Sequence, residues 1–138
     1  MWIVYAIGSS FFAGITAILA KCGIRRTDSD VATAIRTIVV LLFSWLMVLG
    51  TGTIWGIVNI DGKTVLFLVL SGLATGASWM CYYKALQGGP ASVVVPIDKL
   101  SILVTIAFSR IVFHEKLTKK AAAGLLCMTV GTLLLAMM

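Results

Sequence analysis

The chain is organised around the segment CYYKALQGGPASVVVPIDKLS, residues Cys81 to Ser101. One hydrophobic segment ends in it and the next begins, with the turn Gly88-Gly89-Pro90 between them. Pro96 and the adjacent charges of Asp98 and Lys99 follow early in the second hydrophobic segment. A proline and charges are costly inside an apolar helix. This stretch is therefore the first place to look for function.

The composition of the chain excludes an ordinary soluble domain. Of its 138 residues, 60% are hydrophobic and 12% are charged, and the mean hydropathy is +1.08. Soluble domains are about 45–50% apolar and about 25% charged. We therefore expect an all-α integral membrane protein. The formal net charge of +6 comes from basic residues scattered over segment ends, so we expect no nucleic acid as a partner.

Five segments are apolar over the roughly 20 residues that a membrane-spanning helix needs. We expect a single transmembrane domain over residues 1–138, with short loops joining helices at about 2–20, 31–50, 64–86, 92–113 and 120–137. Asp28, Ser29 or Asp30 can cap the second helix, and Thr118 can cap the fifth. The first segment has no basic leader and no small-residue cleavage motif, so we expect a retained helix there.

Charged and aromatic side chains inside the apolar segments are the candidates for substrate binding. An ion near the bilayer centre costs about 2.5–3.5 kcal/mol, so it is a functional candidate by default. Arg36, Asp98 and Lys99 lie about 6 Å from the middle of their segments, at 1.5 Å per residue. Two lysines lie nearer the segment ends, where they could instead reach the interface. The predicted substrate-binding residues are Lys21, Arg36, Trp79, Tyr83, Lys84, Asp98 and Lys99.

Two of these groups have structural alternatives. Pro96 has no N–H, which leaves the carbonyl of Ser92 without its helical donor and predicts a kinked or broken helix whose N-terminus could attract an anion. The alternative is a tolerated proline, with Asp98 and Lys99 neutralising each other. Trp79 and Tyr83 could instead anchor the third helix at the membrane interface, which is the more common role of aromatic residues there.

The sequence gives no support for catalysis or metal binding. Cys22, Cys81 and Cys127 are far apart and are expected to be small buried helix residues. The single histidine, His114, has no set of ligands near it in the sequence. No nucleophile–base pair or phosphate loop is present, so we expect no enzyme, no metal and no cofactor.

The basic residues near the helix ends are almost evenly divided between the two sides of the membrane. The side that holds the N-terminus has five, and the opposite side has four: Lys63, Arg110, Lys116, Lys119 and Lys120 against Lys21, Arg25, Arg26 and Lys84. Orientation follows an excess of Lys and Arg on the cytoplasmic side. Near balance allows insertion both ways, and two opposed copies would form an inverted pair. The alternative is one fixed orientation with a cytoplasmic N-terminus.

Several motifs, in their order and spacing, resemble a single EamA-type domain of the drug/metabolite transporter superfamily, in its small five-helix form. The resemblance covers nearly the whole chain and rests on Ala17–Ile24, Ile35–Thr37, Tyr82–Ser101, His114–Thr118, Gly124 and Gly131. It implies a transporter of small metabolites. Two-domain relatives carry two inverted five-helix repeats around a cavity, so a single repeat implies a homodimer, and an inverted one would rebuild that layout. The resemblance also gives Glu115 a structural role in anchoring its loop into the fifth helix.

We therefore predict a secondary transporter, working as an exporter by alternating access in the inner or plasma membrane. Because the named charges are mostly positive, we expect an anionic or zwitterionic small molecule, such as an amino acid or organic acid. The first helix has no acid, so the mechanism of cation-exporting relatives is not expected here. The alternatives are an uncharged or lipid-linked metabolite as substrate, and a membrane assembly partner that transports nothing.

Overall fold

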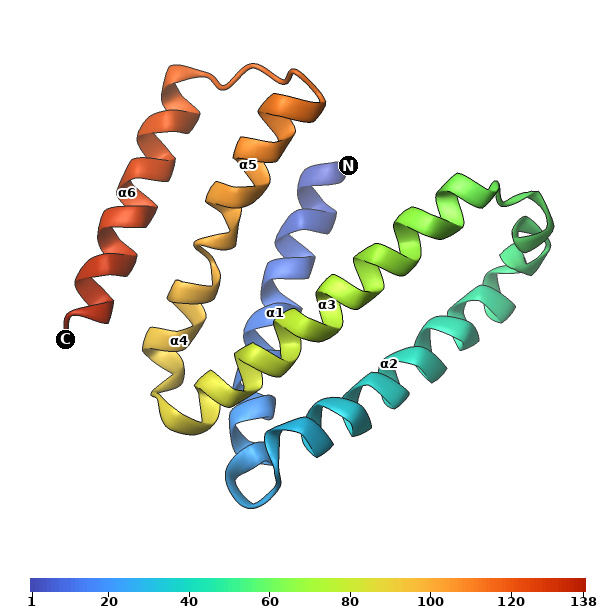
Figure 1. The fold of residues 1–138 in the computed structure, drawn as a ribbon, viewed down its shortest axis with the longest axis horizontal. Helices are drawn as coiled ribbons and strands as arrows, with labels where there is room; N and C mark the ends of the chain where they lie inside the picture. Colours follow the sequence, from blue (N-terminus) through green and yellow to red (C-terminus); the bar gives the residue numbers. More distant parts are fainter. The chain divides into compact units, whose positions relative to one another are not determined.

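The computed structural model describes all residues, 1–138, and contains helices without strands (Figure 1). The elements are α1 (Trp2–Gly23), η1 (Ile24–Arg26), α2 (Ser29–Thr51), η2 (Thr53–Asn59), α3 (Gly62–Gly88), α4 (Ala91–Asp98), α5 (Ser101–Val112) and α6 (Lys119–Ala136), where η marks a 3-10 helix. Five helical spans are long and apolar enough to cross a membrane, with α4 and α5 together forming the fourth. The expected all-α membrane class is confirmed.

The chain divides into two compact units. The first contains Met1–Ala17 and Gly89–Met138, and the second contains Ile18–Gly88. The chain crosses from one unit to the other twice, between Ala17 and Ile18 inside α1 (Trp2–Gly23) and between Gly88 and Gly89 in the turn before α4. We describe each unit by itself.

The second unit is a hairpin of α2 and α3, which pack against each other and are joined by η2 (Figure 1). The side chain of Asp28 caps α2 by accepting a hydrogen bond from the backbone N–H of Asp30 at 3.4 Å. At the other end of α2, Gly52 has φ +69°, a conformation that side chains other than glycine's rarely adopt. These two positions set where α2 begins and ends.

Two polar side chains join the end of α3 to the segment that precedes α2. The Lys21 ammonium donates to the carbonyl of Leu86. The Gln87 amide Nε2 donates to the carbonyls of Ile24, at 3.3 Å, and Thr27, at 2.8 Å. The buried residues of this unit lie at the same end: Ile24, Ser29, Thr33, Tyr83 and Leu86. We call this arrangement the clasp, and it fixes the short η1 connection onto the end of α3.

Removing the Gln87 amide should loosen the clasp. We expect Gln87→Ala to lower the free energy of unfolding by about 1–2 kcal/mol, because two backbone carbonyls lose their donor. Thermal unfolding of the purified protein in detergent measures this loss. The control is Ser44→Ala, since the exposed Ser44 hydroxyl bonds only to the Val40 carbonyl of its own helix, at 2.8 Å. Equal midpoints for the two variants would show that the clasp contributes no stability.

In the first unit, the segment expected as one helix over 92–113 is two helices. α4 ends at Asp98 and α5 begins at Ser101. Between them the backbone N–H groups of Leu100, Ile102 and Leu103 each bond three residues back, at 3.0–3.1 Å. Pro96 lies inside α4 and lacks the N–H that a regular helix would donate to the Ser92 carbonyl, but this missing bond is on the N-terminal side of the proline and does not by itself place the interruption. The interruption follows the proline by three residues.

Another helix of this unit, α6, packs against α4. Its N-cap is Thr118, whose hydroxyl oxygen accepts from the backbone N–H of Ala121 at 3.2 Å. Gly124 and Gly131 have no atom within 4 Å of the place where a Cβ would lie. The same holds for the other helical glycines of the chain, so this open space does not single out α6.

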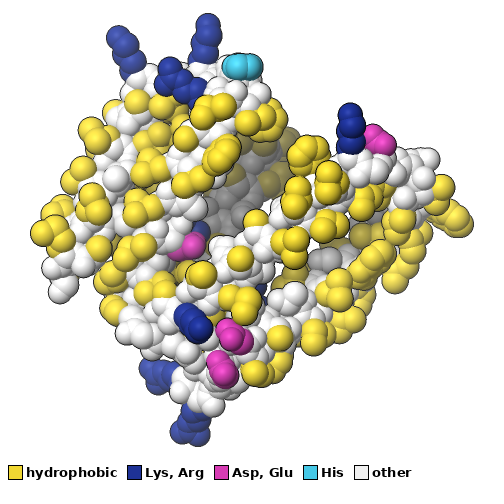
Figure 2. All heavy atoms as spheres, viewed as in Figure 1, with side chains coloured by type: hydrophobic (Ala, Val, Ile, Leu, Met, Phe, Trp, Pro, Cys, Tyr) yellow, Lys and Arg dark blue, Asp and Glu magenta, His cyan; other side chains and the backbone are white.

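Apolar side chains dominate the surface along the helices, and Lys and Arg gather at helix ends (Figure 2). At most 6% of the residues in each apolar window are buried within the chain. The three cysteines, expected to be buried, are all exposed and free: Cys22, Cys81 and Cys127. The reason is that these helices present their apolar residues outward, where a bilayer or a second chain covers them.

Candidate substrate-binding site

In the second unit, Arg36 is the charged residue whose contacts point most clearly to a binding site. It lies on the eighth residue of α2, which begins at Ser29. Its guanidinium carbon is 3.4 Å from the centroid of the Trp79 ring on α3. The side chain is half-buried. The structure gives Arg36 no ion pair and no side-chain hydrogen bond, so its N–H donors remain available.

The ring beneath this guanidinium belongs to an aromatic cluster, Trp79, Tyr82 and Tyr83. Trp79 meets Tyr82 edge-on at 5.3 Å and 82°, and Tyr83 at 5.6 Å and 89°. Tyr83 is buried, with 3% of its surface exposed. Edge-to-face contacts fix the plane of each ring. The cluster therefore holds the Trp79 face in place for Arg36.

Electrostatics makes this arrangement costly without a ligand. Both Arg36 and Trp79 lie about four residues from the middle of their helices, so the pair sits roughly 6 Å from mid-span. A cation at such a depth costs up to about 2.5–3.5 kcal/mol, and a cation–π contact returns about 0.5–2 kcal/mol. The acids of this unit, Asp28, Asp30 and Asp61, stand at helix starts. A bound carboxylate would supply the missing negative charge.

The other predicted residues of this unit divide into two kinds. Lys21 is half-buried and donates to the Leu86 carbonyl, in the last turn of α3, where the helix dipole favours a cation. This contact gives Lys21 a structural role in the clasp. Lys84 is exposed and makes no hydrogen bond or ion pair. The structure thus brings Arg36, Trp79 and Tyr83 together and leaves Lys84 outside the group.

Asp98 and Lys99 belong to the first unit and lie at the interruption between α4 and α5. Their side chains are 3.9 Å apart, and 40% and 53% of their side-chain surfaces are exposed. A pair of neighbouring residues this open gains little from its mutual attraction. Each charge is therefore available to other groups as well.

Sequence reasoning missed Gln87, although it stands in the quoted segment. A polar amide at the end of a long apolar helix was the available signal, but its partners lie 60 and 63 residues away. Glu115 is held by a hydrogen bond from the Ser109 hydroxyl, on α5. The expectation was an anchor into the fifth helix, α6, whereas the contact of Glu115 is with α5, the helix before the loop.

Five apolar helices and a half-buried cation at membrane depth define the class as a multi-pass membrane protein. The chain belongs to the EamA-like transporter family, whose model matches residues 1–137. It is therefore a transporter of that family, and the family points to transport, not catalysis.

Two relatives extend this comparison. The chain is 44% identical over 135 residues to a Sinorhizobium protein named "Uncharacterized transporter in cobO 3'region", covering 98% of this chain and 96% of the relative. It is 28% identical over 103 residues to an uncharacterized protein of Methanocaldococcus jannaschii, covering 68% of this chain and 75% of that one. No solved structure matches. The Sinorhizobium relative thus has nearly the same length as this chain.

Proposed function

We propose that this chain is a secondary transporter that exports a small anionic or zwitterionic metabolite, such as an amino acid or organic acid. The observation that carries the proposal is Arg36, held over the Trp79 ring at 3.4 Å without an acid partner. A guanidinium presents a planar fork of donors that matches a carboxylate. The N–H edge of the guanidinium group is where the substrate carboxylate binds.

The proposal assigns the other predicted residues by their place. Tyr83 and Trp79 shape the aromatic wall beside the carboxylate. Asp98 and Lys99, at the interruption of the fourth span in the first unit, present one charge of each sign and are proposed as a separate contact for a zwitterionic substrate. Lys21 orders the clasp from which the site extends, and Lys84 contributes as a surface charge near the exit. These assignments rest on the type and burial of each side chain.

We further propose that two copies form the working transporter in the inner or plasma membrane. Support comes from the low burial of every span within one copy and from the near balance of basic residues. An inverted pair would present the same site to both sides, and rocking of one copy against the other would give alternating access. The interruption at Lys99 and Leu100 provides a bending point in each copy.

Selectivity of binding tests the substrate class. We expect the purified protein in detergent to bind amino acids or organic acids in preference to quaternary ammonium compounds, because the charge at the proposed site, that of Arg36, is positive and has no acid partner. Thermal stabilisation by each compound of a panel, measured one at a time, gives the ranking. A preference for the quaternary cations would overturn the assignment. A preference for uncharged sugars would instead support the alternative that the protein transports an uncharged metabolite.

A further inference from the structure

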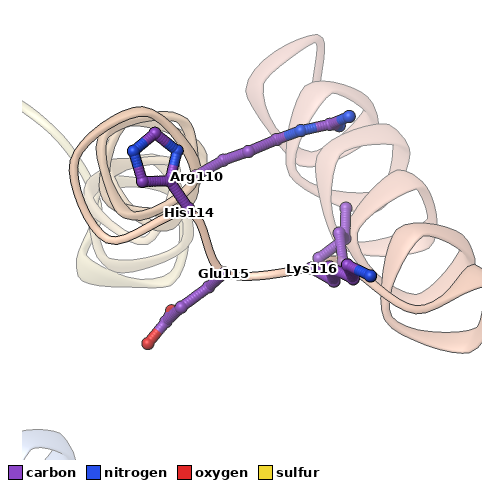
Figure 3. A pocket seen from close by; sticks show the side chains of 5 residues that line it. Arg110, His114, Glu115 and Lys116 are labelled. Carbon is purple, nitrogen blue, oxygen red and sulfur yellow. The ribbon is translucent and has the colours of Figure 1, made fainter.

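The loop between α5 and α6 forms a pocket with the last turn of α5 (Figure 3). The pocket has a volume of about 380 Å³ and is lined by Arg110, His114, Glu115, Lys116 and Leu117. A smaller one of about 80 Å³ shares most of these residues and reaches Ile106 and Ser109. The lining residues from Arg110 to Leu117 are exposed. The pocket is thus open to molecules at the membrane face.

The backbone between α5 and α6 makes a sharp turn at His114. The N–H of Phe113 bonds to the Ser109 carbonyl at 3.0 Å and closes α5. His114 then has φ 53°, a left-handed conformation that costs a residue with a side chain about 1–2 kcal/mol. Thr118 caps α6 four residues later. This turn places the residues on either side of His114 around the pocket.

The cations of the pocket have no acid partner. Arg110 and Lys116 form no ion pair in the structure. The one carboxylate in the lining, that of Glu115, accepts the hydrogen bond of the Ser109 hydroxyl. Figure 3 shows the Glu115 side chain pointing away from Arg110 and Lys116. Lys119 and Lys120 follow at the start of α6, so the positive charge of this loop is largely uncompensated.

The position of the pocket at the edge of the membrane indicates which class of ligand it binds. The fourth span ends at Val112 and the fifth begins at Lys119, so the loop lies at the boundary between hydrocarbon and water. The apolar side chains of Ile111 and Phe113 beside it are 71% and 74% exposed. Cations next to exposed apolar residues match the phosphate and the upper acyl chain of a phospholipid.

We propose that this pocket binds the headgroup phosphate of an anionic phospholipid. Arg110 and Lys116 provide the charge-assisted hydrogen bonds to the phosphate oxygens. Lys119 and Lys120 add attraction to the surrounding anionic surface. The bound lipid ties the α5–α6 loop to one leaflet. This site is separate from Arg36 and does not depend on the transported substrate.

Native mass spectrometry of the purified protein, titrated with phosphatidylglycerol or phosphatidylcholine, tests the proposal. We expect phosphatidylglycerol to bind more tightly than phosphatidylcholine. The double variant Arg110→Gln/Lys116→Gln should weaken phosphatidylglycerol binding roughly 20-fold, at about fivefold per cation near an anionic surface. The swapped variant Arg110→Lys/Lys116→Arg keeps both charges and should retain most of the binding.

The matched control is Arg25→Gln/Arg26→Gln, which removes the same charge from η1 in the other unit. It should change phosphatidylglycerol binding by less than about twofold. An equal loss in both double variants would show a general charge effect and overturn the site. Equal binding of the two lipids would do the same. Millimolar inorganic phosphate should fail to displace the lipid, and complete displacement would assign the pocket to soluble phosphate instead.

Discussion

Replacing Arg36 by glutamine is expected to weaken the binding of carboxylate substrates roughly 10- to 150-fold. This range corresponds to about 1.5–3 kcal/mol of binding free energy, which is the contribution of a hydrogen bond to a charged group. Glutamine keeps a polar side chain of similar length but removes the positive charge and the planar fork. The measurement is the dissociation constant in detergent for the amino acid or organic acid that stabilises the wild-type protein most.

Two variants make the Arg36 result specific. Arg25→Gln removes the same side chain from the exposed η1 turn and should leave the affinity unchanged within about twofold. Arg36→Lys keeps the charge but loses the flat surface that stacks on Trp79, so an intermediate loss is expected. If Arg36→Gln bound carboxylates as tightly as the wild type while remaining folded, Arg36 would have a structural role only.

The second large effect concerns orientation. If two opposed copies form the transporter, variants locked in one orientation should each lose roughly tenfold or more of the activity, because they insert one way. Arg25→Gln/Arg26→Gln leaves five basic residues on the N-terminal side against two. A second variant leaves two against four: Lys63→Gln/Lys119→Gln/Lys120→Gln.

Cells that produce both locked variants together should regain the export of the preferred labelled compound. Cells that produce two differently tagged copies of the same locked variant are the control for protein amount. Reporters fused to both ends of the chain establish that each variant has one orientation. Full export by either locked variant alone would exclude the inverted pair and leave a parallel dimer or a partner protein.

The helices of this chain could be predicted from its sequence because their signals are local. Apolar runs long enough to span a bilayer give the five spans, and Asp28 and Thr118 cap α2 and α6 through hydrogen bonds within three residues. Pro96 likewise predicts a disturbed fourth span, since its effect acts through its own missing N–H. The position of the interruption, at Lys99 and Leu100, depends on how the following residues re-form their bonds.

The site depends on contacts between residues far apart in the chain, and these have no local signal. Arg36 and Trp79 were both candidates, but their stacking follows from the register of α2 against α3. The clasp joins Gln87 to Ile24 and Thr27 across the hairpin. For the cysteines a local rule gave the wrong prediction. Small apolar residues are usually buried in soluble proteins, but here all three cysteines are exposed, because lipid can surround apolar side chains on the outside of the helices.

Counterflow in liposomes that contain only this chain tests the central claim most directly. The account predicts saturable accumulation of the labelled amino acid or organic acid by the wild-type protein. It predicts loss of that accumulation in Arg36→Gln and retention in Arg25→Gln. Quaternary ammonium compounds should not compete. Flux of a quaternary cation that Arg36→Gln leaves intact would contradict the account, as would folded wild-type protein that moves no carboxylate.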